Sequence, residues 1–124
     1  MRFKGTKRDK MNDCLFCKFV SGEFKTDVVY ENDDVLAFND INPQAPTHVL
    51  IIPKKHIATI NDLQPEDEAL VGKLYSAVKH IAKANDFADE GYRVVMNCNA
   101  AAGQTVFHIH LHLLAGRQLS WPPG

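Results

Sequence analysis

The sequence predicts an α+β domain in which an antiparallel sheet of about five strands packs with two helices. Three observations indicate this class. Two segments space their apolar residues as amphipathic helices do, and several short segments have the composition or alternation of strands. Most of these strands follow one another along the chain, which favours antiparallel pairing. A chain of 124 residues with 45% hydrophobic and 23% charged residues also fits one globular domain.

The first predicted helix covers about residues 14–21, with Asp13 as its N-cap and Gly22 as the residue that ends it. Two short strands are expected next, at 28–31 and 35–38, joined by a turn of Asn and Asp residues. Four apolar side chains of the helix would share one face: Leu15, Phe16, Phe19 and Val20.

Residues 48–52 predict a central strand because they are almost all apolar and rich in strand-forming types. Pro65 predicts the start of the longest helix, at about 65–85, whose apolar residues recur at helical spacing. Two more strands are then expected, at 92–97 and 107–114.

Composition and charge argue against several classes of protein. The formal net charge is −1, so no general attraction to nucleic acid is expected. No apolar run approaches the ~18 residues that a membrane span needs. The basic segment 1–12 lacks the apolar stretch of a secretory signal, and we expect it to be a flexible arm before a domain at 13–124. We therefore expect a cytoplasmic protein that binds neither nucleic acid nor membranes.

Three cysteines, an odd number, argue against a disulfide framework. Cys14 and Cys17 form a C-x-x-C motif, which is compatible with half of a zinc site, a redox pair or two ordinary buried cysteines in a helix. No βαβ pattern surrounds the motif, which disfavours a thioredoxin-like redox pair. A zinc site would need two further ligands, and histidines are available downstream.

A row of three histidines stands in the segment His108-Ile109-His110-Leu111-His112. In an extended strand successive side chains alternate between faces, so the three imidazoles would share one face while Ile and Leu face the core. Near neutral pH an imidazole is a general base, a metal ligand or a nucleophile toward phosphorus. The row therefore predicts a reaction centre, with a polar sheet face or a metal-binding stripe as the alternatives.

Neighbouring residues would complete a phosphate site. The segment Gly103-Gln104-Thr105 precedes the histidines and offers close backbone approach, N–H groups and a hydroxyl. Asn97 could donate to a phosphoryl oxygen or a leaving group, and Asp40 could accept from ribose hydroxyls. Taken singly, each has a simpler structural explanation, because Asn97 could only end its strand and Asp40 could only cap a turn.

Together these residues resemble the histidine triad (HIT) superfamily, whose signature H-φ-H-φ-H-φ-φ stands here at 108–114. The resemblance covers about residues 13–124 and extends to the HINT branch, the adenosine phosphoramidate hydrolases. It implies the HIT-like fold for the sheet and helices expected above. Stretches shared with that branch include Asp40-Ile41, Pro43-Gln44-Ala45-Pro46-Thr47-His48, Ile52-Pro53-Lys54-Lys55-His56, Gly103-Gln104 and Trp121-Pro122-Pro123-Gly124.

The resemblance implies that His110 is the nucleophile, which attacks the α-phosphorus of an AMP–amine and forms a transient nucleotidyl-histidine that water hydrolyses. His48 and His112 would line the same site. The backbone carbonyl near His108 would accept from the other ring nitrogen of the nucleophile. No cofactor would be required for catalysis. Three further residues would contact the phosphate or help to protonate the leaving amine: Asn97, Gln104 and Thr105.

The resemblance also implies a pocket for a purine nucleotide, namely AMP, GMP or their phosphoramidates. Asn39 and Thr105 stand where relatives often have His and Ser, so contacts to the base and the phosphate would differ in detail. A dinucleoside-polyphosphate hydrolase, a nucleotidyl transferase and a purine-nucleotide-binding interaction protein are the alternative functions. The nucleotide-binding residues would be Phe16, Phe19, Phe38, Asp40, Ile41, Asn97, Gly103, Gln104, Thr105, His110 and His112.

Finally, the resemblance implies a homodimer in which two sheets join, with the tail around Trp121 reaching toward the partner. In several bacterial relatives the C-x-x-C motif binds a structural zinc with two histidines, and the corresponding ligands here would be Cys14, Cys17, His56 and His108. A protein that only sequesters metal is the remaining alternative, and it predicts metal at His110.

Overall fold

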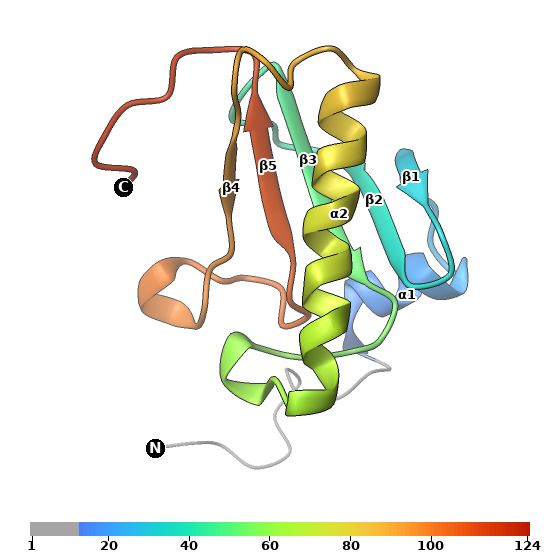
Figure 1. Cartoon of the computed structure of the whole chain (residues 1–124). Helices are drawn as coiled ribbons and strands as arrows, with labels where there is room; N and C mark the ends of the chain where they lie inside the picture. The colour runs from blue at the N-terminus through green and yellow to red at the C-terminus, as the bar shows by residue number, and fades with distance from the viewer. Residues whose placement is uncertain (1–12) are drawn as a thin grey trace.

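The structure is a computed structural model that describes residues 13–124, so the predicted arm at 1–12 lies outside the described residues. One antiparallel sheet holds five strands in the order β1-β2-β3-β5-β4 (Figure 1). This confirms the predicted fold class. The strands are β1 Val28–Glu31, β2 Val35–Asn39, β3 Thr47–Pro53, β4 Arg93–Val95 and β5 Leu111–Ala115.

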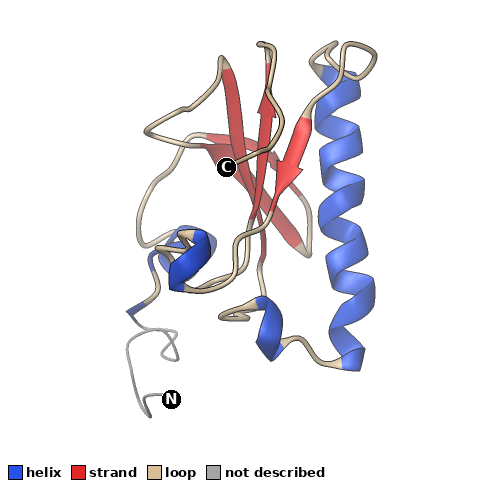
Figure 2. Ribbon diagram, turned by 90° about the vertical axis from the view of Figure 1, so that its left-hand side faces the viewer, coloured by secondary structure: helices blue, strands red, loops and turns tan. Residues whose placement is uncertain are grey.

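Two α-helices lie on opposite faces of the sheet (Figure 2). The short α1 (Leu15–Ser21) covers one face, and the long α2 (Glu68–Ala84) runs along the other. None of the helices in residues 13–124 is long and apolar enough to cross a membrane. Among the described residues, short 3-10 turns also form at η3 Ile60–Asp62, η4 Pro65–Asp67 and η5 Ala100–Ala102.

Because both faces of the sheet are covered, alternate residues of β2 and β3 enter two separate cores. This two-sided burial is why residues 48–52 are almost all apolar. The core beneath α2 receives Val35, Ala37, Val49 and Ile51 from these strands. The core beneath α1 receives Leu36, Phe38, Leu50 and Ile52, together with Cys14 and Phe16 of the N-terminal segment.

Both helices begin differently from the prediction. The N-cap of α1 is Cys14 rather than Asp13, because the Cys14 sulfur accepts from the Cys17 N–H at 3.3 Å. Gly22 ends the helix as predicted, with a left-handed φ of 83°. The segment at Pro65 forms a 3-10 turn before α2, where the Asp67 carboxylate accepts from the Gln64 N–H.

The predicted strand at 107–114 is wrong in its first half, because β5 begins at Leu111. The Ile109 N–H donates to the carbonyl of Ile57, in the loop after β3, at 2.7 Å instead of joining the ladder. β4 is likewise shorter than the predicted 92–97. The alternation nevertheless holds, since Ile109, Leu111 and Leu113 are buried in the core beneath α2.

Candidate active site

A cavity of about 290 Å³ lies between α1, the end of β2 and the histidine segment. Three aromatic rings form one wall, and Phe38 packs edge to face against Phe16 at 5.4 Å and Phe19 at 5.1 Å between ring centroids. Eight of the predicted site residues line this cavity: Phe16, Phe19, Phe38, Asp40, Ile41, Thr105, His110 and His112. Its mixture of apolar walls and a few polar groups is typical of a small-molecule site.

His110 lies against this cavity with one ring nitrogen held by the backbone. Its Nδ1 is 2.8 Å from the carbonyl oxygen of His108, which can only accept, so the hydrogen is assigned to Nδ1. Burial lowers the pKa of His110, although the hydrogen bond to His108 opposes the shift. The ring is therefore neutral near pH 7, and its Nε2 carries a free lone pair.

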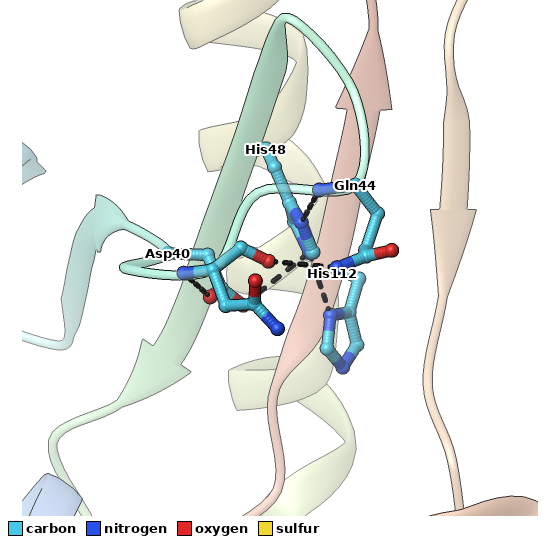
Figure 3. A network of polar contacts seen from close by, with 5 residues as sticks. Asp40, Gln44, His48 and His112 are labelled. Carbon is cyan, nitrogen blue, oxygen red and sulfur yellow. Dashed lines mark hydrogen bonds and ion pairs between the residues drawn. The ribbon is translucent and has the colours of Figure 1, made fainter.

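A second chain of contacts fixes His48 and His112 (Figure 3). The Gln44 N–H donates to His48 Nδ1 at 3.0 Å, so His48 carries its hydrogen on Nε2. That Nε2–H donates to His112 Nδ1 at 2.9 Å, which leaves the hydrogen of His112 on its own Nε2. His112 lines the cavity, so it presents an N–H donor near His110, whose ring centroid is 4.9 Å away.

The protonation of this chain follows from burial. Burial, together with the neighbouring rings of His110 and His48, lowers the pKa of His112 to about 4. Burial also lowers the pKa of His48, against an opposing attraction from Asp40. The Asp40 carboxylate lies 3.5 Å from His48 Nε2 and accepts from the Asn42 N–H through its other oxygen. Both histidines are therefore neutral near pH 7.

The two cysteines of the C-x-x-C motif contact a second pair of histidines, His56 and His108. The distances between ligand atoms are 3.3 Å from Cys14 Sγ to His108 Nδ1, 3.2 Å from Cys17 Sγ to His56 Nδ1, and 3.3 Å between the two Nδ1 atoms. All four ligand atoms lie within 4.8 Å of one another. The four residues, hereafter the Cys₂His₂ cluster, are Cys14, Cys17, His56 and His108.

The geometry of the Cys₂His₂ cluster fits a tetrahedral zinc ion. Ligands at ~2.0–2.3 Å from such an ion lie about 3.3–3.8 Å from one another, close to the separations seen here. His108 Nε2 is 2.7 Å from the carbonyl oxygen of Pro53, so its hydrogen lies there and Nδ1 is bare toward the sulfurs. Burial and the adjacent Cys14 raise the pKa of Cys17 to about 12, and a bound cation would reverse that effect.

Three of the predicted phosphate contacts do not line the cavity: Asn97, Gly103 and Gln104. The Gln104 amide is buried and holds the loop instead, because its oxygen accepts from the Asn99 N–H while its nitrogen donates to the carbonyls of Ala58 and Val106. It therefore has no donor left for a phosphate, contrary to expectation. Gly103 supplies the left-handed residue, at φ 87°, that ends η5.

The structure also adds residues that the sequence analysis missed. Leu50 faces the cavity because it pairs with Phe38 across β2 and β3, which alternation along the two strands could have revealed. Val106 follows Thr105 and closes another part of the wall. The Gln44 N–H that orients His48 is a backbone group, so no side-chain pattern could identify it.

Comparisons with known proteins agree with the fold. The model of the HIT domain family matches residues 21–119. An uncharacterised HIT-like protein of Synechococcus elongatus is 51% identical over 112 residues, which are 90% of this chain and 97% of that protein. The purine nucleoside phosphoramidase of Escherichia coli K12 is 47% identical over 107 residues, 86% of this chain and 90% of the enzyme.

A solved structure gives the same result. The HIT family hydrolase from Legionella pneumophila superposes with a TM-score of 0.88 at 56% identity, covering 90% of this chain and 99% of that one. The chain therefore belongs to the HIT family, which confirms the resemblance found in the sequence.

Proposed function

We propose that the protein is a purine nucleotide phosphoramidate hydrolase, which cleaves the P–N bond of AMP–amines through a nucleotidyl-histidine at His110. The observation that carries this proposal is the 2.8 Å contact between His110 Nδ1 and the His108 carbonyl, which leaves Nε2 free at the cavity. The similarity to the Escherichia coli purine nucleoside phosphoramidase supports the choice of substrate.

Substrate binding would place the phosphorus at His110. The base would lie against the wall of Phe16, Phe19 and Phe38, and the ribose hydroxyls would donate to Asp40. The α-phosphate would then meet the Nε2–H of His112, with the Thr105 hydroxyl as a second polar group at the same cavity. These donors stabilise the negative charge that builds up on the phosphoryl oxygens.

Two displacements complete the reaction. His110 Nε2 attacks phosphorus, the P–N bond breaks, and the leaving nitrogen takes a proton from solvent water to depart as an amine. Water then attacks the nucleotidyl-histidine, releases AMP and restores the neutral ring. Over both steps water supplies hydroxide to phosphorus and a proton to the amine. The buried carbonyl of His108 keeps the Nδ1–H in place and stabilises the ring when it becomes cationic.

A structural zinc ion in the Cys₂His₂ cluster is a second part of the proposal. The ligand separations and the bare Nδ1 of His108 support it. The ion would hold α1 against the loop that carries His56, and His110 stays outside the ligand set. Catalysis itself requires no cofactor in this proposal.

A homodimer joined at the sheet edge is the third part. Within residues 13–124, β4 lies at the edge of the sheet and pairs with β5 alone, which leaves one side of its backbone open to a partner strand. Two large apolar side chains near this edge are exposed, Tyr92 at 38% and Trp121 at 81%. Sedimentation of the purified protein tests this point, and a monomer at micromolar concentration would contradict it.

Replacement of the nucleophile tests the main proposal. His110→Asn should lower turnover of an adenosine phosphoramidate by at least about 10⁴-fold, while AMP still binds. Comparison with diadenosine tetraphosphate separates the alternatives, because preferred cleavage of that compound would instead indicate a dinucleoside-polyphosphate hydrolase. Substantial turnover by the His110→Asn variant would refute the covalent route.

A further inference from the structure

The helix α1 contributes to two sites at once. Cys14, at its N-cap, and Cys17, in its first turn, belong to the Cys₂His₂ cluster. Phe16 and Phe19, on the same short helix, line the cavity that the proposed function assigns to the nucleotide. The two sets of side chains interleave along a helix of 7 residues, so any shift of the helix moves both.

The position of α1 depends on its contacts with the rest of the chain. A helix of this length has little stability of its own, since isolated helices shorter than about 12 residues are marginal in water. The apolar contacts come from Phe16, which is buried in the core beneath α1, and from Phe19 and Val20, which are partly buried against that core. The two sulfurs reach His56 and His108, which belong to the loops that follow β3 and precede β5.

His108 connects the same cluster to the nucleophile. Its Nδ1 faces the sulfurs, its Nε2–H donates to the carbonyl of Pro53 at the end of β3, and its own carbonyl accepts from His110 Nδ1. Phe16 contacts both rings, with centroids 6.0 Å from His108 and 5.0 Å from His110. The side chain and the backbone of one fully buried residue thus join the two sites.

We propose that a divalent metal at the Cys₂His₂ cluster and a nucleotide in the cavity bind cooperatively, with α1 and His108 as the positioning elements. The metal fixes α1, and therefore the Phe16 and Phe19 wall, and it holds the backbone of His108 that orients His110. This inference rests on the metal and nucleotide sites of the proposed function. Thermodynamic linkage requires the effect to be reciprocal, so AMP strengthens metal binding by the same factor.

Two titrations of the full chain test the coupling. The dissociation constant of AMP is measured by calorimetry for protein loaded with Zn²⁺ and for protein stripped by a chelator, with circular dichroism to show that both are folded. The Zn²⁺ affinity is measured by competition with a chromogenic chelator, with and without saturating AMP. We expect AMP to bind at least about 5-fold more weakly to the stripped protein, and Zn²⁺ affinity to rise by the same factor with AMP.

A spectroscopic measurement on metal-loaded protein needs no comparison with the stripped protein. Co²⁺ replaces Zn²⁺, and its absorption bands report the thiolate and imidazole geometry at the cluster directly. We expect AMP to shift these bands in the wild type and in Cys98→Ser, which removes the cysteine outside the cluster. The Cys14→Ser, Cys17→Ser double variant should lose the bands and bind AMP as weakly as the stripped protein.

Three results would overturn the coupling: no binding of Zn²⁺, an equal AMP affinity of loaded and stripped protein, or Co²⁺ bands that ignore AMP. Each of them leaves the hydrolase proposal standing, because that proposal is tested by the turnover of His110→Asn relative to wild type. Conversely, a hydrolase proposal that fails leaves the reciprocal binding measurements valid, since they use AMP without turnover.

Discussion

Two clusters of histidines flank His110, and they differ in where their hydrogens lie. Both place at least three potential metal ligands within 4.8 Å, one with Cys14, Cys17, His56 and His108 and the other with Asp40, His48 and His112. In the first, a carbonyl takes the Nε2–H of His108 and leaves its Nδ1 bare toward the sulfurs. In the second, a backbone N–H occupies His48 Nδ1 and forces the hydrogen onto Nε2.

This difference decides the chemistry of each cluster. A cation at His48 Nε2 would have to displace its hydrogen to Nδ1, where the Gln44 N–H already donates. The second cluster is therefore a chain of hydrogen bonds that ends in the Nε2–H of His112, while the first suits a metal. The Gln44 N–H donates to His48, whereas the Pro53 carbonyl accepts from His108. This difference in backbone partner makes one cluster a hydrogen-bond chain and suits the other to a metal.

The largest effect on turnover should come from His110→Asn, because His110 forms the bond to phosphorus. The largest effect on stability should come from the Cys₂His₂ cluster. With Zn²⁺ at about 1,000 times its dissociation constant, the Cys14→Ser, Cys17→Ser double variant should lose about 4 kcal/mol of unfolding free energy. Thermal unfolding with and without a chelator measures this, with Cys98→Ser as the matched control.

The number of metal ions bound per chain tests whether the two clusters differ in metal binding. We expect one Zn²⁺ per chain, retained in His48→Gln and lost in the double cysteine variant. A second equivalent that disappears with His48→Gln would show that the Asp40, His48 and His112 cluster also binds metal, and the assigned hydrogens would then be wrong.

A matched pair of variants at position 48 tests the hydrogen-bond chain. Gln places an N–H near the position of the imidazole Nε2, whereas Asn reaches only the position of Nδ1, so His48→Asn leaves His112 Nδ1 without its donor. We expect turnover by His48→Asn to fall about 10- to 100-fold, and turnover by His48→Gln to fall less. Equal losses in both, measured at saturating substrate, would contradict the proposed orientation of His112.

The stability of the fold should depend on pH through His112. Its pKa is about 4 in the folded protein, below the ordinary value of 6.5, so the unfolded chain binds the proton first on acidification. The stabilisation is complete above pH 6.5 and is lost as the pH falls from 6.5 to 4. Urea unfolding at several pH values should show this slope, reduced in His112→Asn. A slope unchanged by that substitution would mean that His112 is charged in the fold.

The smallest effect is expected at an exposed ion pair whose side chains belong to neither cluster. Lys73 and Asp34 form an ion pair at 2.9 Å, and both side chains are about half exposed. Lys73→Met should change the unfolding free energy by less than about 1 kcal/mol and leave turnover and metal content unchanged. A large loss of turnover here would show that activity is sensitive to general stability, and the variants above would need reinterpretation.

The sequence predicted the parts of this site that depend on side-chain periodicity. Alternation placed Ile109 and Leu111 in the core and the three histidines opposite, even though β5 begins only at Leu111. Parts that depend on backbone partners could not be predicted. Gln104 was expected at the phosphate because its amide is a suitable donor, but three backbone groups of the surrounding loops occupy that amide. The two hydrogens that distinguish the clusters are also set by backbone groups.

The central claim is that His110 Nε2 becomes covalently bonded to phosphorus during turnover. The most direct measurement is rapid quenching of a single turnover into alkali, where a phosphorus–histidine bond survives, followed by mass spectrometry of the digested protein. We predict a nucleotidyl group on the peptide that carries residues 108–112, localised to His110 and absent from His110→Asn. Complete hydrolysis of the substrate with no protein-bound nucleotide at any time, or with the group on another residue, would contradict this account.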